Sequence, residues 1–234
     1  MRHASIEQAS SFIDSVVSLN PRLAVFDCDG TLWSGDAGER FFDWELKRGV
    51  VSDDIVRWAR ARYVEYRAGK VTEDEMCGEM VTLHRGLKET DVLALGRQFF
   101  EENFVRRIFP EMRELIARLQ AAGTDVWAVS STNRWVIREA MTHVGIAPEK
   151  ILAASAEVKD GVITDHLTRL PSGPGKPKAI LEVIKRVPDV AFGNSRWDAN
   201  MLALAANAFA INPNPDLEIM AQEENWTIYW PTSS

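Results

Sequence analysis

One apolar segment, residues 22–26, ends directly in two aspartates, Asp27 and Asp29, which are followed by Thr31. An apolar run of this kind is typical of a strand buried in a parallel sheet, and open α/β sheets bind ligands at the carboxyl ends of their strands. Residues two apart on a strand point the same way, so both carboxylates would face one site. Because clustered carboxylates repel unless a cation lies between them or one is protonated, the segment predicts an acidic site at a sheet edge.

This arrangement of carboxylates suits phosphoryl transfer. A hard cation such as Mg2+ prefers oxygen ligands and substrate phosphate, and the second carboxyl group can act as general acid and then as general base. The other interpretation is an exposed acidic turn that caps a helix, since Asp-Gly is a common turn dipeptide. A turn requires neither the preceding apolar strand nor Thr31 after it, which favours the catalytic interpretation.

The run Asp27-Cys28-Asp29-Gly30-Thr31 resembles the first motif of the haloacid dehalogenase-like superfamily of phosphohydrolases, which is Asp-x-Asp-x-Thr after an apolar strand. The resemblance implies that Asp27 is the nucleophile, which becomes an aspartyl-phosphate, and that Asp29 is the acid/base that protonates the leaving alcohol. Thr31 would support this pair. A true dehalogenase does not need the second aspartate, so the resemblance points to a phosphatase.

A second polar cluster, Ser-Ser-Thr-Asn at 130–133, follows an apolar run at 126–129 and precedes a helical pattern over 134–144. Taken alone, such a cluster is typical of a helix N-cap. In the order of the superfamily motifs, Ser130 matches the second one. Its hydroxyl, with the adjacent backbone amides at a helix N-terminus, would hold the phosphoryl oxygens.

Two lysines compete for the third motif in the segment Gly-Lys-Pro-Lys at 175–178. By its place after the second motif, Lys176 resembles the third-motif lysine, which would neutralise Asp27 and the transferring phosphoryl group. We favour Lys176 because a glycine precedes it. Lys178 is the rival, and a solvated surface lysine is the alternative interpretation of either.

The fourth motif departs from the superfamily pattern. An apolar run is followed by Gly-Asn-Ser-Arg-Trp-Asp at 193–198, where family members usually carry Gly-Asp-x-x-x-Asp. Asn194 stands in place of the first aspartate, and its amide oxygen can ligate Mg2+ but brings no charge. The resemblance implies a metal site formed by Asp27, the Asp29 backbone carbonyl and Asn194. Asp198 would order waters and the third-motif lysine.

Composition and charge disfavour several classes of protein. A net charge of −7 and a pI near 5.2 argue against nucleic acid or an anionic membrane as the main partner. Two cysteines do not make a disulfide framework, so the reducing cytoplasm is the simplest compartment. No apolar run approaches the ~20 residues of a membrane span, and residues 1–18 lack the apolar core of a signal peptide. We expect a cytoplasmic protein that acts on a small phosphorylated metabolite.

Strand-like and helix-like periods divide the chain into two parts. Strands alternate with helices in residues 1–35 and 108–234, which predicts an α/β core with a doubly wound, Rossmann-like parallel sheet. Residues 36–107 read as a helical insert, which resembles the small cap that closes over the active site in the phosphoserine phosphatase-like branch of the superfamily. The expected helices are 5–19, 39–48, 53–68, 73–85, 89–108, 111–122, 134–144 and 179–187; the expected strands are 22–26, 125–129, 150–154, a hairpin over 157–168, 190–192, 208–211 and 226–229.

Three further residues are candidates for contacts with the substrate. Asp36 falls near the place where phosphoserine phosphatases carry an acidic residue for the substrate amine, and Trp33 lies next to the catalytic turn. Ser131, next to the second-motif Ser130, is the third candidate. Those enzymes also use a cap arginine for the carboxylate of serine, and our register places Met80 there, with Arg85 the nearest arginine downstream. Phosphoserine, phosphocholine, phosphoethanolamine and small sugar phosphates all stay open.

The sequence therefore predicts a Mg2+-dependent phosphomonoesterase that works through an aspartyl-phosphate on Asp27. One alternative is a phosphotransferase of the same fold, in which an acceptor alcohol replaces water. Another is a catalytically weak relative that binds a phospho-ligand, because Asn194 removes a charge from the expected metal site.

Overall fold

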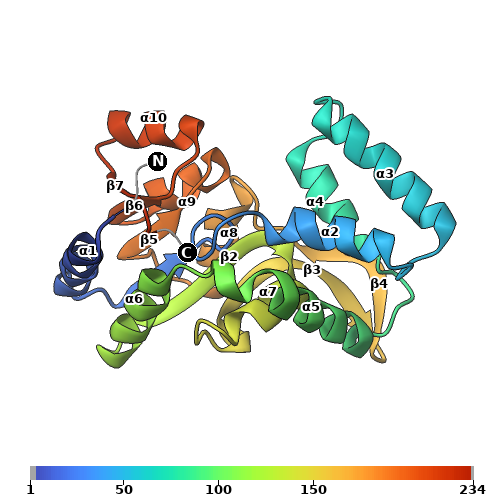
Figure 1. Ribbon diagram of the computed structural model, residues 1–234, viewed down its shortest axis with the longest axis horizontal. Helices are drawn as coiled ribbons and strands as arrows, with labels where there is room; N and C mark the ends of the chain where they lie inside the picture. The colour runs from blue at the N-terminus through green and yellow to red at the C-terminus, as the bar shows by residue number, and fades with distance from the viewer. Residues whose placement is uncertain (1–3, 233–234) are drawn as a thin grey trace.

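Residues 4–232, which the computed structural model describes, are built around one seven-stranded sheet (Figure 1). The strand order is β4-β3-β2-β1-β5-β6-β7, and only the β3–β4 pair is antiparallel. The chain runs outward from the central strand to both edges, which confirms the predicted doubly wound parallel sheet. The strands are β1 (Leu23–Phe26), β2 (Asp125–Asn133), β3 (Ile151–Lys159), β4 (Val162–Arg169), β5 (Val190–Gly193), β6 (Asn207–Ile211) and β7 (Thr227–Tyr229).

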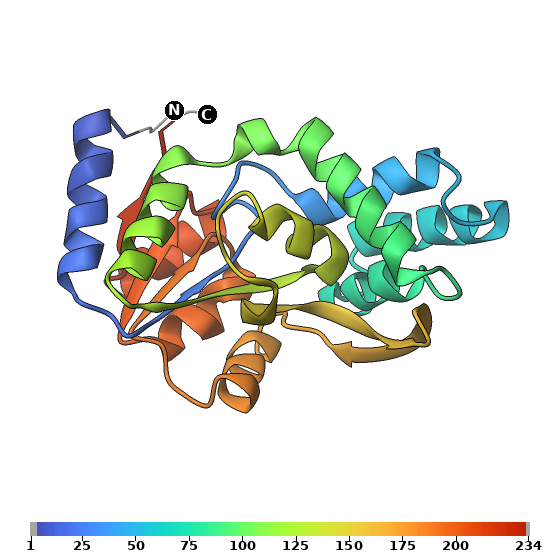
Figure 2. The ribbon, with the colours of Figure 1, turned by 90° about the horizontal axis from the view of Figure 1, so that it is seen from below.

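Helices cover both faces of this sheet, because adjacent residues of β1 point to opposite faces. Ala24 and Phe26 belong to a hydrophobic cluster with α1, α6 and α7, whereas Leu23 and Val25 belong to another with α8, α9 and α10. Figure 2 shows the sheet between α6 and α8. The helices are α1 (Ile6–Ser18), α6 (Pro110–Ala121), α7 (Arg134–Met141), α8 (Gly175–Val183), α9 (Ala199–Leu204) and α10 (Pro215–Glu223).

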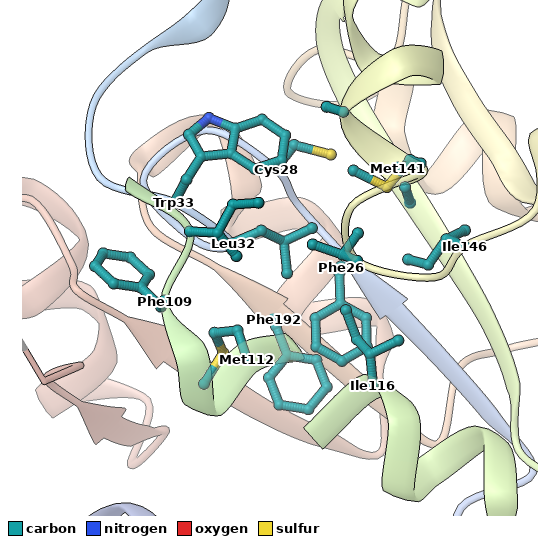
Figure 3. Close-up of a cluster of buried hydrophobic side chains, with 14 of the residues drawn as sticks. Phe26, Cys28, Leu32, Trp33, Phe109, Met112, Ile116, Met141, Ile146 and Phe192 are labelled. Atoms are coloured by element: carbon teal, nitrogen blue, oxygen red, sulfur yellow. The ribbon is translucent and has the colours of Figure 1, made fainter. Parts of the chain in front are cut away.

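The first of these clusters lies under the carboxyl end of β1. Phe26 stacks on Phe192 of β5 with ring centroids 4.1 Å apart, and Met112 and Ile116 of α6 belong to the same cluster (Figure 3). Trp33 lies in this cluster too and is fully buried. The turn that carries the two aspartates is therefore attached to the core both before and after it.

Residues 36–107 contain the four predicted helices: α2 (Ala37–Lys47), α3 (Asp53–Arg67), α4 (Glu73–Thr82) and α5 (Glu89–Asn103). A capping box of Thr72 and Glu75 is present at the start of α4. We call α2, α3 and α4 the helical lobe, because they share a hydrophobic cluster separate from those of the core. In Figure 1 the lobe lies at the end of the molecule opposite α1.

The fourth helix, α5, packs along α7 of the core. A Cβ on Gly96 would lie 3.1 Å from the backbone oxygen of Trp135, so the absence of a side chain permits this approach. Phe99 and Phe100 of α5 join the same core cluster as Trp33. The helical content of the insert matches the prediction, but its last helix is packed as part of the core.

β2 and β3 are longer than predicted, and the extra length of β3 reaches the lobe. The strand predicted over 150–154 and the first arm of the predicted hairpin are one continuous strand, β3, which turns through Asp160 and Gly161 into β4. Both turn residues have positive φ, 50° and 77°, as a tight hairpin turn requires. The hairpin packs against α4 through Val81 and Ile163. It therefore supports the lobe from the side of the sheet.

Helix ends differ from the prediction by a few residues. α8 begins at Gly175 instead of Ala179, which places Lys176 in its first turn. The 3-10 turns η1 (Val105–Arg107), η2 (Pro148–Lys150) and η3 (Arg196–Asp198) occupy connections. Within residues 4–232, no helix has the length and apolar character that crossing a membrane requires.

Phe192→Ala removes one ring of the stacked pair at the centre of the sheet. Because Phe192 is fully buried, we expect the free energy of unfolding to fall by about 3–5 kcal/mol. Val187→Ala removes an exposed apolar side chain that precedes β5 and should change the free energy of unfolding by less than about 0.5 kcal/mol. Urea denaturation of both variants checks this, and similar effects from the two substitutions would contradict the packing described above.

Candidate active site

The predicted motif residues lie at the carboxyl ends of three neighbouring strands. Asp27 and Asp29 follow β1, Ser130 lies on β2 and Asn194 follows β5. The backbone N–H of Asp27 donates to the Phe192 carbonyl, at 2.9 Å, which holds the end of β1 against β5. β1 is also where the two outward runs of the sheet separate, the place where open α/β sheets bind ligands.

A buried lysine joins two of the acidic residues. The Nζ of Lys176 donates to Asp27 Oδ1 at 2.7 Å, to Asp198 Oδ1 at 2.6 Å and to the Val129 carbonyl at 3.1 Å. The Lys176 side chain is only 2% exposed, whereas that of Lys178 is 73% exposed. The structure thus places Lys176, and not Lys178, among the acidic motif residues.

These contacts set the charges of the group. Burial by itself would lower the pKa of Lys176, but Asp198 and Asp27 raise it above its ordinary value. Burial, together with the negative charge of Asp198, raises the pKa of Asp27 to about 6 against the opposing effect of Lys176. Thr31 donates its hydroxyl to Asp27 Oδ2 at 2.9 Å. Above pH ~6 the Asp27 side chain is therefore an oriented carboxylate.

Asp198 also orders the loop that contains Asn194. Its Oδ2 accepts hydrogen bonds from the backbone N–H groups of Asn194 and Ser195, both at 2.9 Å. A Cβ on Gly193 would lie 2.5 Å from the Asp198 Cβ, so this close turn needs a glycine. One carboxylate thus holds both Lys176 and the backbone after β5.

Asp29 is held by contacts quite different from those of Asp27. Its Oδ1 accepts from the Trp33 indole N–H at 2.8 Å and from the Ala37 backbone N–H at 2.6 Å, and its Oδ2 accepts from the Thr132 hydroxyl at 2.7 Å. Burial, followed by the charge of Asp36, raises the pKa of Asp29 to about 8. A hydroxyl can also accept a hydrogen bond, so the contact with Thr132 suits both protonation states of Asp29.

The two neighbouring carboxyl groups therefore differ in protonation state near neutral pH. Between pH ~6 and ~8, Asp27 is ionised while Asp29 holds a proton. Environments that push two carboxyl pKa values apart separate a nucleophile from an acid. The same surroundings raise the pKa of the Cys28 thiol, through burial and the charges of Asp27 and Asp29, so Cys28 is a buried, unreactive thiol.

The residues at the predicted metal site supply oxygen donors of the kind that Mg2+ prefers: a carboxylate of Asp27, a backbone carbonyl of Asp29 and the amide oxygen of Asn194. Gly30 makes room for the Asn194 side chain, because a Cβ at residue 30 would lie 1.9 Å from Asn194 Nδ2. Within residues 4–232, no three His, Cys, Asp or Glu side chains are grouped as metal ligands. The donor set fits the cation chemically, and it depends on the amide and carbonyl oxygens.

The hydroxyl residues after the apolar part of β2 have different positions. Ser130 is buried, and its Oγ accepts from the Thr132 backbone N–H at 3.1 Å. Ser131 is half-buried and lines a cavity between the core and the helical lobe. Thr132, which sequence reasoning passed over, contacts both Asp29 and this cavity. The sequence signal that could have indicated Thr132 is its place in the polar run that follows an apolar strand.

The other substrate candidates differ in whether they line this cavity, which has a volume of about 200 Å³. Asp36 lines it, but Trp33 is fully buried in the core and positions Asp29 instead of contacting the cavity. Met80 lines it, whereas Arg85 pairs with Asp165 on the surface. Sequence reasoning missed four other charged residues on its wall. They are Glu39, Glu45, Arg67 and Glu73.

The buried lysine between two carboxylates thus lies at the carboxyl ends of the central strands of a doubly wound sheet, where such sheets bind ligands. The sequence model of the haloacid dehalogenase-like hydrolases matches residues 24–203 of this chain. The chain belongs to this family.

Named relatives agree with this assignment. The chain is 26% identical over 217 residues to phosphoserine phosphatase SerB1 of Mycobacterium tuberculosis, covering 88% of this chain and 69% of that protein. It is 26% identical over 218 residues to a histidinol-phosphatase of Neisseria meningitidis, covering 88% of this chain and 97% of that protein. A crystal structure of a protein of unknown function from Bordetella pertussis shares the fold, with a TM-score of 0.78, 21% identity and coverage of 89% and 97%.

Asp29→Asn should stabilise the metal-free protein at alkaline pH. A carboxyl group whose pKa rises on folding, here from 3.8 to about 8, contributes stability at low pH and loses it as the pH rises through the folded value. Asparagine cannot ionise and avoids this loss. We expect the variant's advantage in free energy of unfolding to grow from pH ~5 to pH ~9 by more than about 1 kcal/mol.

Urea denaturation in EDTA at both pH values measures this advantage. Asp165→Asn is the matched control, because Asp165 is exposed and the hydrogen bond from Arg85 lowers its pKa. The control variant should gain nothing at alkaline pH. An equal advantage of Asp29→Asn at both pH values would show that Asp29 is ionised throughout.

Proposed function

We propose that the protein is a Mg2+-dependent phosphatase that hydrolyses a small phosphomonoester through an aspartyl-phosphate on Asp27. The observation that carries this proposal is the buried Lys176, which contacts both Asp27 and Asp198. A cation in this position stabilises negative charge that develops on a phosphoryl group bound next to Asp27. Its cost of burial is offset by the two carboxylates.

In the first half-reaction, a carboxylate oxygen of Asp27 attacks phosphorus and the ester P–O bond breaks. The leaving alkoxide takes the proton of Asp29, whose raised pKa keeps that proton available near neutral pH. Lys176 and the Ser130 hydroxyl stabilise the charge on the phosphoryl oxygens.

In the second half-reaction, the roles of Asp29 reverse. Its carboxylate takes a proton from water as the water oxygen attacks phosphorus, which releases phosphate and restores both aspartates. The contact between Thr132 and Asp29 can serve either protonation state, since the hydroxyl can donate or accept.

Asp27, the Asp29 carbonyl and Asn194 would hold the metal ion. When bound, Mg2+ supplies positive charge to the phosphoryl oxygens. Because Asn194 stands where the family pattern has an aspartate, these three ligands carry one negative charge fewer than that pattern. We therefore expect the ion to bind weakly.

Asp27→Asn should lower phosphate release by at least about a thousandfold, because it removes the nucleophile. The measurement uses p-nitrophenyl phosphate, O-phosphoserine, histidinol phosphate, phosphoethanolamine and a sugar phosphate, each with Mg2+ and with EDTA. We expect release by the unmodified protein only with Mg2+. Asp165→Asn, a surface change of the same type, should retain full activity.

The same assay separates the proposal from its alternatives. If transfer to added glycerol exceeds phosphate release, the protein is a phosphotransferase. If folded, Mg2+-saturated protein releases phosphate from no substrate in the panel, the phosphatase proposal is overturned in favour of a binding role.

Asn194→Asp should lower the Mg2+ concentration for half-maximal activity by about tenfold, because it adds a negative charge to the metal site. Asn200→Asp is the matched control, since Asn200 is exposed on α9, and it should leave the Mg2+ dependence unchanged. A Mg2+ titration of the three proteins provides the comparison. Equal midpoints for all three would place the ion away from Asn194.

A further inference from the structure

The cavity between the core and the helical lobe extends along one side of α2. The α2 residues on its wall are Gly38, Glu39, Phe42 and Glu45, a spacing that places them on one helix face. Asp29 contacts the first residue of this helix through the Ala37 N–H. One end of the cavity is therefore close to the proposed acid, and the far end is close to Glu45.

Glu45 is 1% exposed and is paired with a buried histidine. Its Oε2 lies 2.7 Å from His84 Nε2, and His84 Nδ1 lies 3.0 Å from the Val81 carbonyl oxygen. A carbonyl can only accept, so Nδ1 carries a hydrogen. Glu45 and His84 consequently share one further proton on the line between Oε2 and Nε2, either as imidazolium and carboxylate or as two neutral groups.

The other oxygen of Glu45 is left without a partner. Oε1 is buried and makes no hydrogen bond with any described residue. Because the shared proton lies between Oε2 and Nε2, Oε1 is a hydrogen-bond acceptor in both states of the pair. A buried acceptor without a donor is costly. Glu45 is one of the residues that line the cavity, but Oε1 itself is covered by protein atoms, so a donor on a ligand reaches it from the cavity only if those atoms move aside.

The rest of the wall favours a cation. Three more carboxyl groups line the cavity, those of Asp36, Glu39 and Glu73, against one guanidinium, that of Arg67. Tyr63 and Tyr66 donate their hydroxyls to Glu39 and Glu73 and so orient these carboxylates. Aromatic rings beside oriented carboxylates attract an organic cation.

The length of α2 sets the distance that the ligand must span. Glu45 lies eight residues after Ala37, about 12 Å along the helix axis at ~1.5 Å per residue. Its side chain leans back toward the helix N-terminus, which shortens this span by part of its length. A donor that reaches Oε1 must therefore be several bonds away from an ester oxygen next to Asp29.

We propose that this cavity selects phosphomonoesters whose alcohol carries an N–H cation several carbons away from the ester oxygen, with Glu45 Oε1 accepting its hydrogen bond. The inference rests on the proposed phosphatase activity and names the substrate class of that site. Glu45 is a specificity-determining residue here, and no carboxylate on the alcohol is needed. A trimethylammonium group offers charge but no N–H, so it leaves Oε1 without a donor.

The test is a series of ω-aminoalkyl phosphates with two, four and six carbons, each compared with the neutral alkyl phosphate in which CH3 replaces NH3+. We expect the kcat/KM ratio of each pair to increase from two to four or six carbons, reaching about tenfold. The trimethylammonium analogue of the best compound keeps the attraction of the wall carboxylates but offers no N–H, so it should lose the part of this preference that increases with chain length. A ratio that is independent of chain length, or largest at two carbons, overturns the proposal.

Two variants test the role of Glu45. Glu45→Leu removes the acceptor and should abolish the preference for the longer amines. In Glu45→Gln the amide N–H can donate to His84 Nε2, which leaves an amide oxygen in the place of Oε1, so the preference should be retained. Retention of the preference in Glu45→Leu overturns the assignment. If that variant does not fold, the trimethylammonium comparison decides.

A binding measurement separates this inference from the proposed function. The shift in melting temperature produced by 6-aminohexyl phosphate is compared with that produced by heptyl phosphate, using the unmodified protein. No hydrolysis even of p-nitrophenyl phosphate would reject the phosphatase, while a larger shift with the amine would still support the cation site. Hydrolysis of p-nitrophenyl phosphate with equal shifts for the two compounds would reject the cation site alone.

Discussion

The ammonium group of Lys176 between Asp27 and Asp198 is the contact on which the site depends. It joins the end of β1, the start of α8 and the turn after β5, three elements far apart in the sequence. All three side chains are buried, so removal of Lys176 would leave two carboxylates without a counter-charge in a medium that solvates them poorly. The stacked rings of Phe26 and Phe192 keep the two strands together directly beneath this group.

The second aspartate links the chemistry to the helical lobe. Asp29 accepts a hydrogen bond from the first residue of α2 and another from Thr132 of β2. A Cβ on Gly38 would lie 2.4 Å from the Thr132 Oγ1, so this part of α2 can approach β2 only because the position is a glycine. The Asp29 carboxyl group, which we assign as the acid, is therefore held by the same contacts that attach the helical lobe to the core. Movement of α2 would alter both the cavity and the hydrogen bonds of Asp29.

A single sequence contains local information about the fold, and here that information was sufficient for most elements. The apolar run before Asp27 indicated a buried strand, and the pattern over 157–168 indicated a hairpin. It could not show that α5 packs on α7 or that the hairpin arm is an extension of β3. Those features depend on contacts between segments distant in the sequence, such as Gly96 against Trp135.

The sequence by itself determined which residues have the chemistry for phosphoryl transfer, because motif order and residue type are properties of the chain. Only the tertiary structure decided which of them meet. It placed Lys176 among carboxylates and Lys178 on the surface, and it placed Trp33 behind Asp29, away from the cavity. It also revealed Glu45, a charged residue on the mostly apolar side of α2. Its partner, His84, lies on a different segment, and the pairing of two such segments is set by packing in three dimensions, which local sequence patterns do not encode.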